Sequence, residues 1–173
     1  MANPAMTLIS SQTLGGTTAS VTFSSIPSTY NDLKLLVSAR GSTATVNQFI
    51  NIAFNGDSAT NYSYTLLNGV GTTSASTRVS SSTFDAGVSF DAASATASTF
   101  GSAEIYIPNY NATASKPWFD LSMVENNSSS LNVVSANSHL YRGASGISSI
   151  TLTPNNGNFV QYSTFTLYGI ANS

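Results

Sequence analysis

Apolar and polar residues alternate along much of the chain, with the two-residue period of half-buried β-strands. In residues 33–39, Leu33, Leu35 and Val37 share one face, while Lys34 and Ser38 lie on the other. Similar apolar faces are formed by Val21 with Phe23, Ile50 with Ile52 and Phe54, Tyr62 with Tyr64 and Leu66, Ile105 with Ile107, Phe119 with Leu121 and Met123, Ile150 with Leu152, and Phe165 with Leu167. No segment of ten or more residues has a helical period. The pattern predicts one all-β domain over 1–173, a jelly-roll-like antiparallel β-sandwich of about nine to eleven short strands.

Turn residues separate these segments. Asn55-Gly56-Asp57 follows an alternating stretch and supplies the positive-φ residues that a tight hairpin needs. Pro27, Pro108 and Pro154 stand at the ends of predicted strands, where a missing N–H donor costs little. Short strands with tight connections are therefore expected throughout.

Two segments interrupt the alternation. Residues 69–82 are rich in Thr and Ser and residues 86–98 in Ala and Ser, and both have few bulky side chains. We predict a loop region over 69–98, in addition to an N-terminal segment over 1–14. A long excursion of this kind is either an arm that packs on a neighbouring subunit or slack surface chain.

The composition favours a folded protein with a nearly neutral surface. Ser and Thr supply 52 residues and Asn 17, whereas Lys, Arg, Asp and Glu supply 12. Charged residues are 7% of the chain, against about 25% in ordinary domains. Because 41% of residues are hydrophobic, the chain can form a core and is not expected to be disordered. Depletion of charge is typical of protein interfaces, so we expect a surface that other proteins bind.

Charge and chain pattern exclude several classes of function. The formal charge is −2 and no basic run occurs, which argues against a nucleic-acid groove. No apolar run is long enough to span a bilayer, and residues 1–11 lack the regions of a signal peptide. We expect no membrane partner and a soluble protein made in a cytoplasm. The absence of Cys excludes disulfides and thiolate metal sites.

Candidate catalytic groups are few. Asp85 with Asp91, or Asp120 with Glu125, are conceivable glycosidase pairs, but their spacing does not require it. His139 is the sole histidine, and no Gly-x-Ser-x-Gly elbow accompanies it. One His and no Cys leave transition metals without ligands, and no EF-hand spacing supports calcium. We predict no enzyme and no catalytic, cofactor-binding or metal site.

The candidate interface residues are aromatic or polar side chains of predicted strands and loops. Trp118 lies on the polar side of the strand with Phe119 and Leu121, so partial exposure is expected. Core or edge packing, a protein interface and a glycan platform remain open for Trp118. His139 lies opposite Leu140, which predicts a surface or interface position. The predicted interface set is Trp118, Tyr110, His139, Tyr141 and Arg142.

Several short segments, read together, carry a resemblance. They are Ile26-Pro27-Ser28-Thr29-Tyr30-Asn31-Asp32-Leu33, Arg40-Gly41, Phe54-Asn55-Gly56-Asp57 with Asn61-Tyr62, Ile105-Tyr106-Ile107-Pro108-Asn109-Tyr110, and Thr166-Leu167-Tyr168-Gly169-Ile170. The chain resembles small virion structural proteins of tailed bacteriophages, of the capsid decoration, cement or tail-associated type. The similarity runs from about Gly15 to Ile170, and its motifs are structural.

The resemblance implies a jelly-roll-like sandwich bound in many copies to a virion. A capsid decoration protein that binds and stabilises the major capsid protein lattice is the leading expectation. A tail or fibre module that recognises host-surface glycans is the alternative. Because few charges protect strand edges, we also expect a homo-oligomer, a trimer first and a dimer second.

Overall fold

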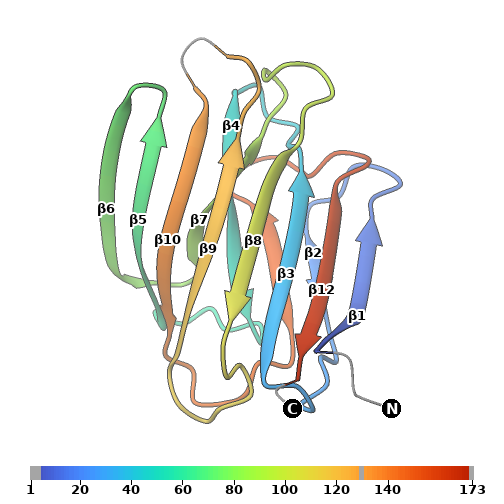
Figure 1. Ribbon diagram of the computed structural model, residues 1–173, viewed down its shortest axis with the longest axis vertical. Helices are drawn as coiled ribbons and strands as arrows, with labels where there is room; N and C mark the ends of the chain where they lie inside the picture. The colour runs from blue at the N-terminus through green and yellow to red at the C-terminus, as the bar shows by residue number, and fades with distance from the viewer. Residues whose placement is uncertain (1–4, 129–130, 172–173) are drawn as a thin grey trace.

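The computed structural model describes residues 5–128 and 131–171, which form two antiparallel β-sheets packed face to face (Figure 1). The larger sheet has the order β1-β12-β3-β8-β9-β10-β5-β6 and the smaller one β2-β11-β4-β7. The large-sheet strands are β1 (Met6–Thr13), β12 (Thr164–Ile170), β3 (Asp32–Ala39), β8 (Gly101–Ile107), β9 (Lys116–Val124), β10 (Val133–Tyr141), β5 (Tyr62–Val70) and β6 (Thr73–Ser82). The small-sheet strands are β2 (Val21–Phe23), β11 (Ile150–Pro154), β4 (Asn47–Phe54) and β7 (Asp85–Asp91). The predicted all-β sandwich is confirmed, and the jelly-roll connectivity stays a prediction.

The described residues form twelve strands, and four of them, β1, β6, β7 and β10, are not among the eight segments with predicted apolar faces. The prediction of a loop over 69–98 is wrong for most of its length, because β6 and β7 lie within it. Strand β6 buries almost no side chain and is held by backbone pairing with β5, so no alternation marks it. Of the predicted N-terminal segment, residues 6–13 form edge strand β1, and residues 1–4 lie outside the described residues.

The core lies between the sheets. Leu33, Leu35 and Val37 point inward from β3, as their alternation predicts. Phe159 packs against Phe90 of β7 and Phe165 of β12, with ring centroids 5.5 and 4.9 Å away. Each such side chain contributes about 1.5–3 kcal/mol by leaving water. Apolar packing therefore joins the sheets in the half of the sandwich that contains β3 and β12.

The turn after β4 has the predicted backbone but a different role. Asn55 and Gly56 have φ values of 54° and 65°, as the Asn-Gly sequence predicts. The strands that flank them do not pair, since β4 belongs to the small sheet and β5 to the large sheet. The turn therefore carries the chain from one layer of the sandwich to the other.

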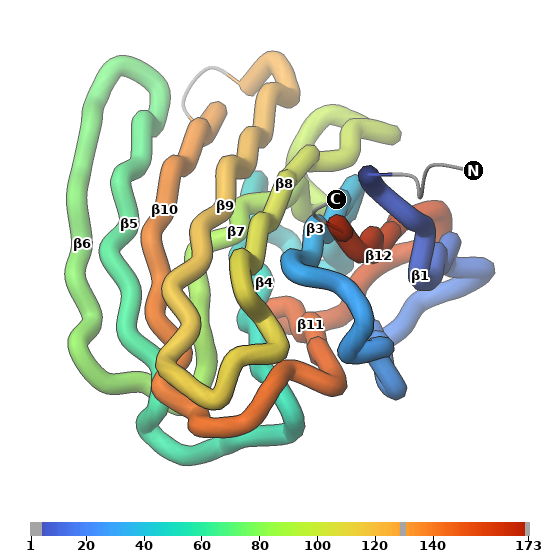
Figure 2. Tube along the Cα trace, turned by 60° about the horizontal axis from the view of Figure 1, so that its bottom comes forward, coloured from blue at the N-terminus to red at the C-terminus, as the bar shows by residue number. Residues whose placement is uncertain are grey.

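The hairpin of β5 and β6 extends beyond the small sheet, at the left of Figure 1. Figure 2 shows the layers from another side, with β7 and β4 under β10, β9 and β8, while β6 lies outside them. Strand β6 is an edge of the large sheet and β1 is the other. No helix that could cross a membrane occurs in the described part of the chain.

Candidate functional site

Strands β9 and β10 carry opposite chemistry on their two faces. Alternate side chains point between the sheets, and these are largely polar; they are Trp118, Asp120 and Ser122 of β9 and Ser135, Asn137 and His139 of β10. The intervening side chains point outward and are largely apolar; they are Phe119, Leu121 and Met123 of β9 and Val134 and Ala136 of β10. The polar rows are buried and the apolar rows exposed, the reverse of an ordinary sandwich.

The inner rows converge on His139. Its Nε2 lies 2.8 Å from Oδ1 of Asp120 on β9, and its Nδ1 faces Oδ1 of Asp85 on β7 at 3.5 Å. Its ring stacks on Trp118, with centroids 3.7 Å apart and planes 7° apart. The indole N–H of Trp118 donates to Oδ2 of Asp85 at 3.0 Å. The side-chain amide of Asn137 donates to both oxygens of Asp120 at 3.0 and 3.2 Å.

In the cluster formed by His139, Asp85, Asp120 and Trp118, burial and charge have opposite effects on the pKa values of His139 and Asp85. Burial favours the neutral imidazole of His139, but the hydrogen bonds and negative charges of Asp120 and Asp85 prevail and raise its pKa. Burial raises the pKa of Asp85, and the hydrogen bond and positive charge of His139 oppose that rise. A protonated His139 between two acidic side chains is the arrangement that this geometry favours.

The cluster joins the two sheets. Asp85 comes from the small sheet, whereas Asp120, His139 and Trp118 come from the large sheet. Further along β7, the Ser89 N–H donates to Oγ of Ser122 at 3.0 Å. Gly87, a bulge residue with φ 132°, accepts a hydrogen bond from Asn137 through its carbonyl. Polar contacts therefore replace apolar packing between β7 and the β9–β10 pair.

A catalytic role does not suit these groups, because each of Asp85, Asp120, Trp118 and His139 is at most 4% exposed. General acid–base chemistry requires contact with a substrate, which a closed interior does not admit. Among the described residues, no group of three or more acidic, His or Cys side chains is placed to hold a metal ion. Of the conceivable carboxylate pairs, Asp85 and Asp120 contact His139, and Asp91 accepts a hydrogen bond from Asn126.

The expected exposure of the predicted interface residues is wrong for four of the five. Trp118, Tyr110, His139 and Tyr141 lie in the interior. The phenol of Tyr110 donates to the Pro27 carbonyl, and that of Tyr141 donates to Asp57 at 3.1 Å. Tyr and Trp can be buried because their polar atoms find partners inside.

Arg142, the fifth predicted interface residue, is half-buried. Its guanidinium donates to the Thr60 carbonyl at 2.7 Å and to the Ser63 hydroxyl at 3.1 Å. Arg142 therefore holds the connection between β4 and β5.

The outward rows form a continuous surface, here called the outer apolar face, across β3, β8, β9, β10 and β5. Its large apolar members are between 37% and 56% exposed; they are Leu36, Leu67, Phe119, Leu121, Met123 and Val134. Strand register places Leu121 beside Ala136 of β10, which in turn lies beside Leu67 of β5. Met123 lies beside Val134 in the same way. Because neighbouring exposed apolar side chains of this kind are enriched at interaction sites, the outer apolar face is the candidate functional surface.

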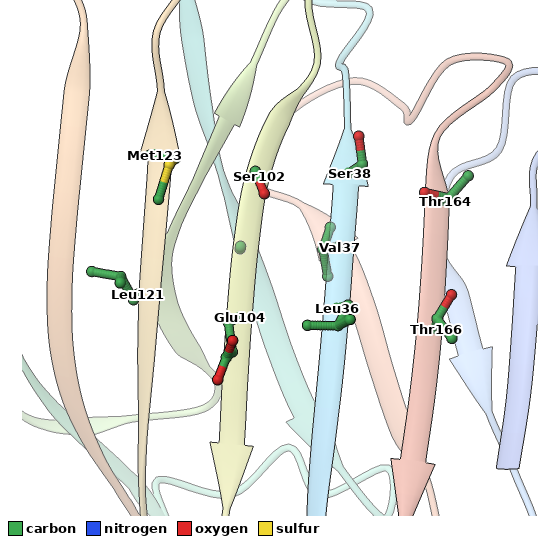
Figure 3. A pocket seen from close by; sticks show the side chains of 10 residues that line it. Leu36, Val37, Ser38, Ser102, Glu104, Leu121, Met123, Thr164 and Thr166 are labelled. Carbon is green, nitrogen blue, oxygen red and sulfur yellow. The ribbon is translucent and has the colours of Figure 1, made fainter. Parts of the chain in front are cut away.

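Shallow grooves follow this face between the rows of side chains. One, of about 440 Å³, runs over β9, β8, β3 and β12, and Figure 3 shows Leu121, Met123 and Leu36 along it with Thr164 and Thr166 at its far side. A second, of about 510 Å³, lies between Leu121 and Leu67. Both are open, and their linings combine apolar side chains with polar ones, such as Glu104 in the first groove and Asn137 in the second. Open grooves of this kind suit protein side chains better than an enclosed small ligand.

The outer apolar face has little charge. Lys34 of β3 and Glu104 of β8 form an ion pair of 2.8 Å on it. At the far edge, Arg78 of β6 donates to the Thr65 hydroxyl at 3.2 Å. Since Lys34 and Glu104 already neutralise each other, covering this pair buries no unpaired charge.

Comparison with known proteins adds no relative. No family model matches the chain, and no curated protein matches it. The functional interpretation therefore depends on the residues and on the geometry described above.

Proposed function

We propose that the protein is a virion structural subunit of the capsid decoration type, which binds the major capsid protein lattice and stabilises it. The observation that carries the proposal is the outer apolar face, on which Phe119, Leu121 and Met123 are about half exposed. A chain that buries Asp120 and His139 while exposing these side chains is suited to binding proteins. The resemblance of its sequence segments to phage virion proteins supports this kind of assembly.

The mechanism is thermodynamic linkage. A protein that binds the assembled lattice, and not its dissociated subunits, stabilises that lattice by mass action. With charged residues at 7% of the chain, many copies repel one another little at high density on a particle. In this proposal, the protein stabilises the lattice through its area of contact with the lattice subunits, without a chemical step or a cofactor.

A glycan-binding tail or fibre module is not favoured by any observation. That alternative needed Trp118 and Tyr110 as an exposed platform for sugar rings. Trp118 is 3% exposed and Tyr110 is fully buried. The proposal therefore concerns the virion shell rather than host recognition.

The test is addition of the purified protein to particles of the same phage prepared without it. Co-sedimentation should detect binding, and the temperature at which the particles release DNA should rise with occupancy until the sites are filled. A neutral protein of similar size, added at the same concentration, is the control and should not move that temperature. Lack of co-sedimentation together with an unchanged release temperature would contradict the proposal.

A further inference from the structure

We propose that the outer apolar face binds the same face of a second copy of this chain, in a two-fold symmetric dimer. The inference shares with the proposed function the premise that the chain is an assembly subunit. It adds a second partner for the surface that carries the proposed function. One chain uses the outer apolar face either in the free dimer or on the lattice, and not in both at once. The pairing would form a four-layer stack in which the two large sheets are the inner layers.

The size of the face reaches the lower end of what a specific contact needs. Strands β3, β8, β9, β10 and β5 are neighbours in the sheet. At about 4.8 Å per strand and about 3.3 Å per residue, five strands and the seven residues 117–123 define a face of roughly 24 by 23 Å, or roughly 550 Å². Two such faces bury roughly 1,100 Å², which exceeds the approximately 1,000 Å² expected of a specific interface.

The chemistry of the face also suits close stacking. Around the apolar side chains, the outward positions hold small hydroxyl residues, among them Ser38, Ser102 and Thr166. Small residues beside larger ones let two sheets approach to about 10 Å, and hydroxyls can bond across the contact. The Lys34–Glu104 pair adds no net charge that two copies would have to bring together.

A second copy fits this surface better than a charged or a small partner. In a two-fold symmetric contact, the same surface of both copies forms the interface. The outer apolar face must therefore be complementary to itself. A sheet face with one internally neutralised ion pair meets that condition. At its margins, Asp32 accepts hydrogen bonds from Tyr106 and Asn109, and Arg78 lies on β6, outside the five strands of the face. Its grooves are open, unlike the enclosed cavity that holds a metabolite.

The test compares two Phe→Glu substitutions by sedimentation velocity and light scattering between about 1 and 100 μM, a range that covers weak to moderate dimers. Phe119 is 48% exposed on the outer apolar face, and Phe84 is 37% exposed beside the outward side of the small sheet. The wild-type chain should have twice its monomer mass of 18.0 kDa. Phe119→Glu should weaken the dimer by roughly 100-fold or more, because two carboxylates would be buried without partners. Phe84→Glu should remain dimeric.

Leu121→Lys is a second disrupting variant in case Phe119→Glu fails to fold, as judged by circular dichroism. A monomeric wild-type chain at 100 μM, a trimeric mass, or a dimer that survives both disrupting variants overturns the inference. Particle binding, measured in parallel, separates this inference from the proposed function. A wild-type monomer that binds particles through Phe119 overturns the dimer alone, whereas a dimer that ignores particles overturns the decoration function alone.

Discussion

At the scale of single residues, His139 differs most from expectation. Its alternation with Leu140 was recognised, but its surroundings depend on two features that alternation does not encode. The register of β9 and β10 brings it against Trp118, and the packing of β7 brings Asp85 to its other side. The sequence contains the carboxylates that surround His139, but dozens of residues separate Asp85 from His139, so the sequence does not show that they meet. A buried charge of this kind is defined by partners that only the folded chain assembles.

From the cluster around His139, we predict that the free energy of unfolding falls as pH rises above neutrality. The raised pKa of His139 means that its contribution is complete below its ordinary pKa of about 6.5 and is lost as pH rises through the folded value. The groups facing it are Asp85 from β7, Asp120 from β9 and Tyr64 from β5. The raised pKa of Asp85 gives a loss of the same sign, which begins at the lower pH of its ordinary value of 3.8. Urea unfolding should give a higher free energy of unfolding at about pH 6 than at about pH 9.

His139→Gln is the control for this pH dependence. The chain has one histidine and no cysteine, so besides this ring mainly the α-amino group has an ordinary pKa in that range. The variant should lose about 3 kcal/mol of stability at pH 6, because Asp120 and Asp85 lose their shared partner. Its stability should then depend little on pH between the two values. An equally steep dependence in His139→Gln would show that His139 is not its source.

At the scale of elements, the strands could be predicted more reliably than their orientation. In β3 the inward row is wholly apolar from Leu33 on, whereas Leu36 is the single apolar residue of the outward row, and the prediction that Leu33, Leu35 and Val37 face the core is confirmed. In β9 both rows contain large apolar residues, since Trp118 lies on one and Phe119 on the other. The row with Asp120 was therefore interpreted as outward. It faces inward because His139 and Asn137 satisfy its carboxylate.

The orientation of β9 predicts different costs for two Leu→Ser substitutions. Leu121 is 44% exposed, whereas Leu167 of β12 is fully buried. Measured by urea unfolding at sub-micromolar concentration, where chains are dissociated, Leu121→Ser should cost less than about 1 kcal/mol. Leu167→Ser should cost about 3 kcal/mol or more, because it leaves a cavity and a buried hydroxyl. Equal losses for the two variants would mean that Leu121 lies in the core.

At the scale of the whole molecule, the sandwich divides into two halves with different chemistry. The half around β3 and β12 has an apolar interior, as composition and alternation predict. The half around β7, β9 and β10 has a polar interior and an apolar exterior. The low charge of the sequence indicated a protein that binds proteins, but the binding face could not be located from alternation. Finding it required the register of five neighbouring strands.

The claim that the outer apolar face is exposed in the free chain and covered on assembly is tested most directly by maleimide labelling of Leu121→Cys. This variant would have a single thiol. Labelling of the dilute, dissociated chain should be rapid, because this side chain points away from the interior. Assembly, either as a concentrated dimer or on particles, should protect the thiol strongly. A thiol that resists labelling in the dilute folded chain, or one that labels equally fast in every assembled state, would show that this face is not the binding surface.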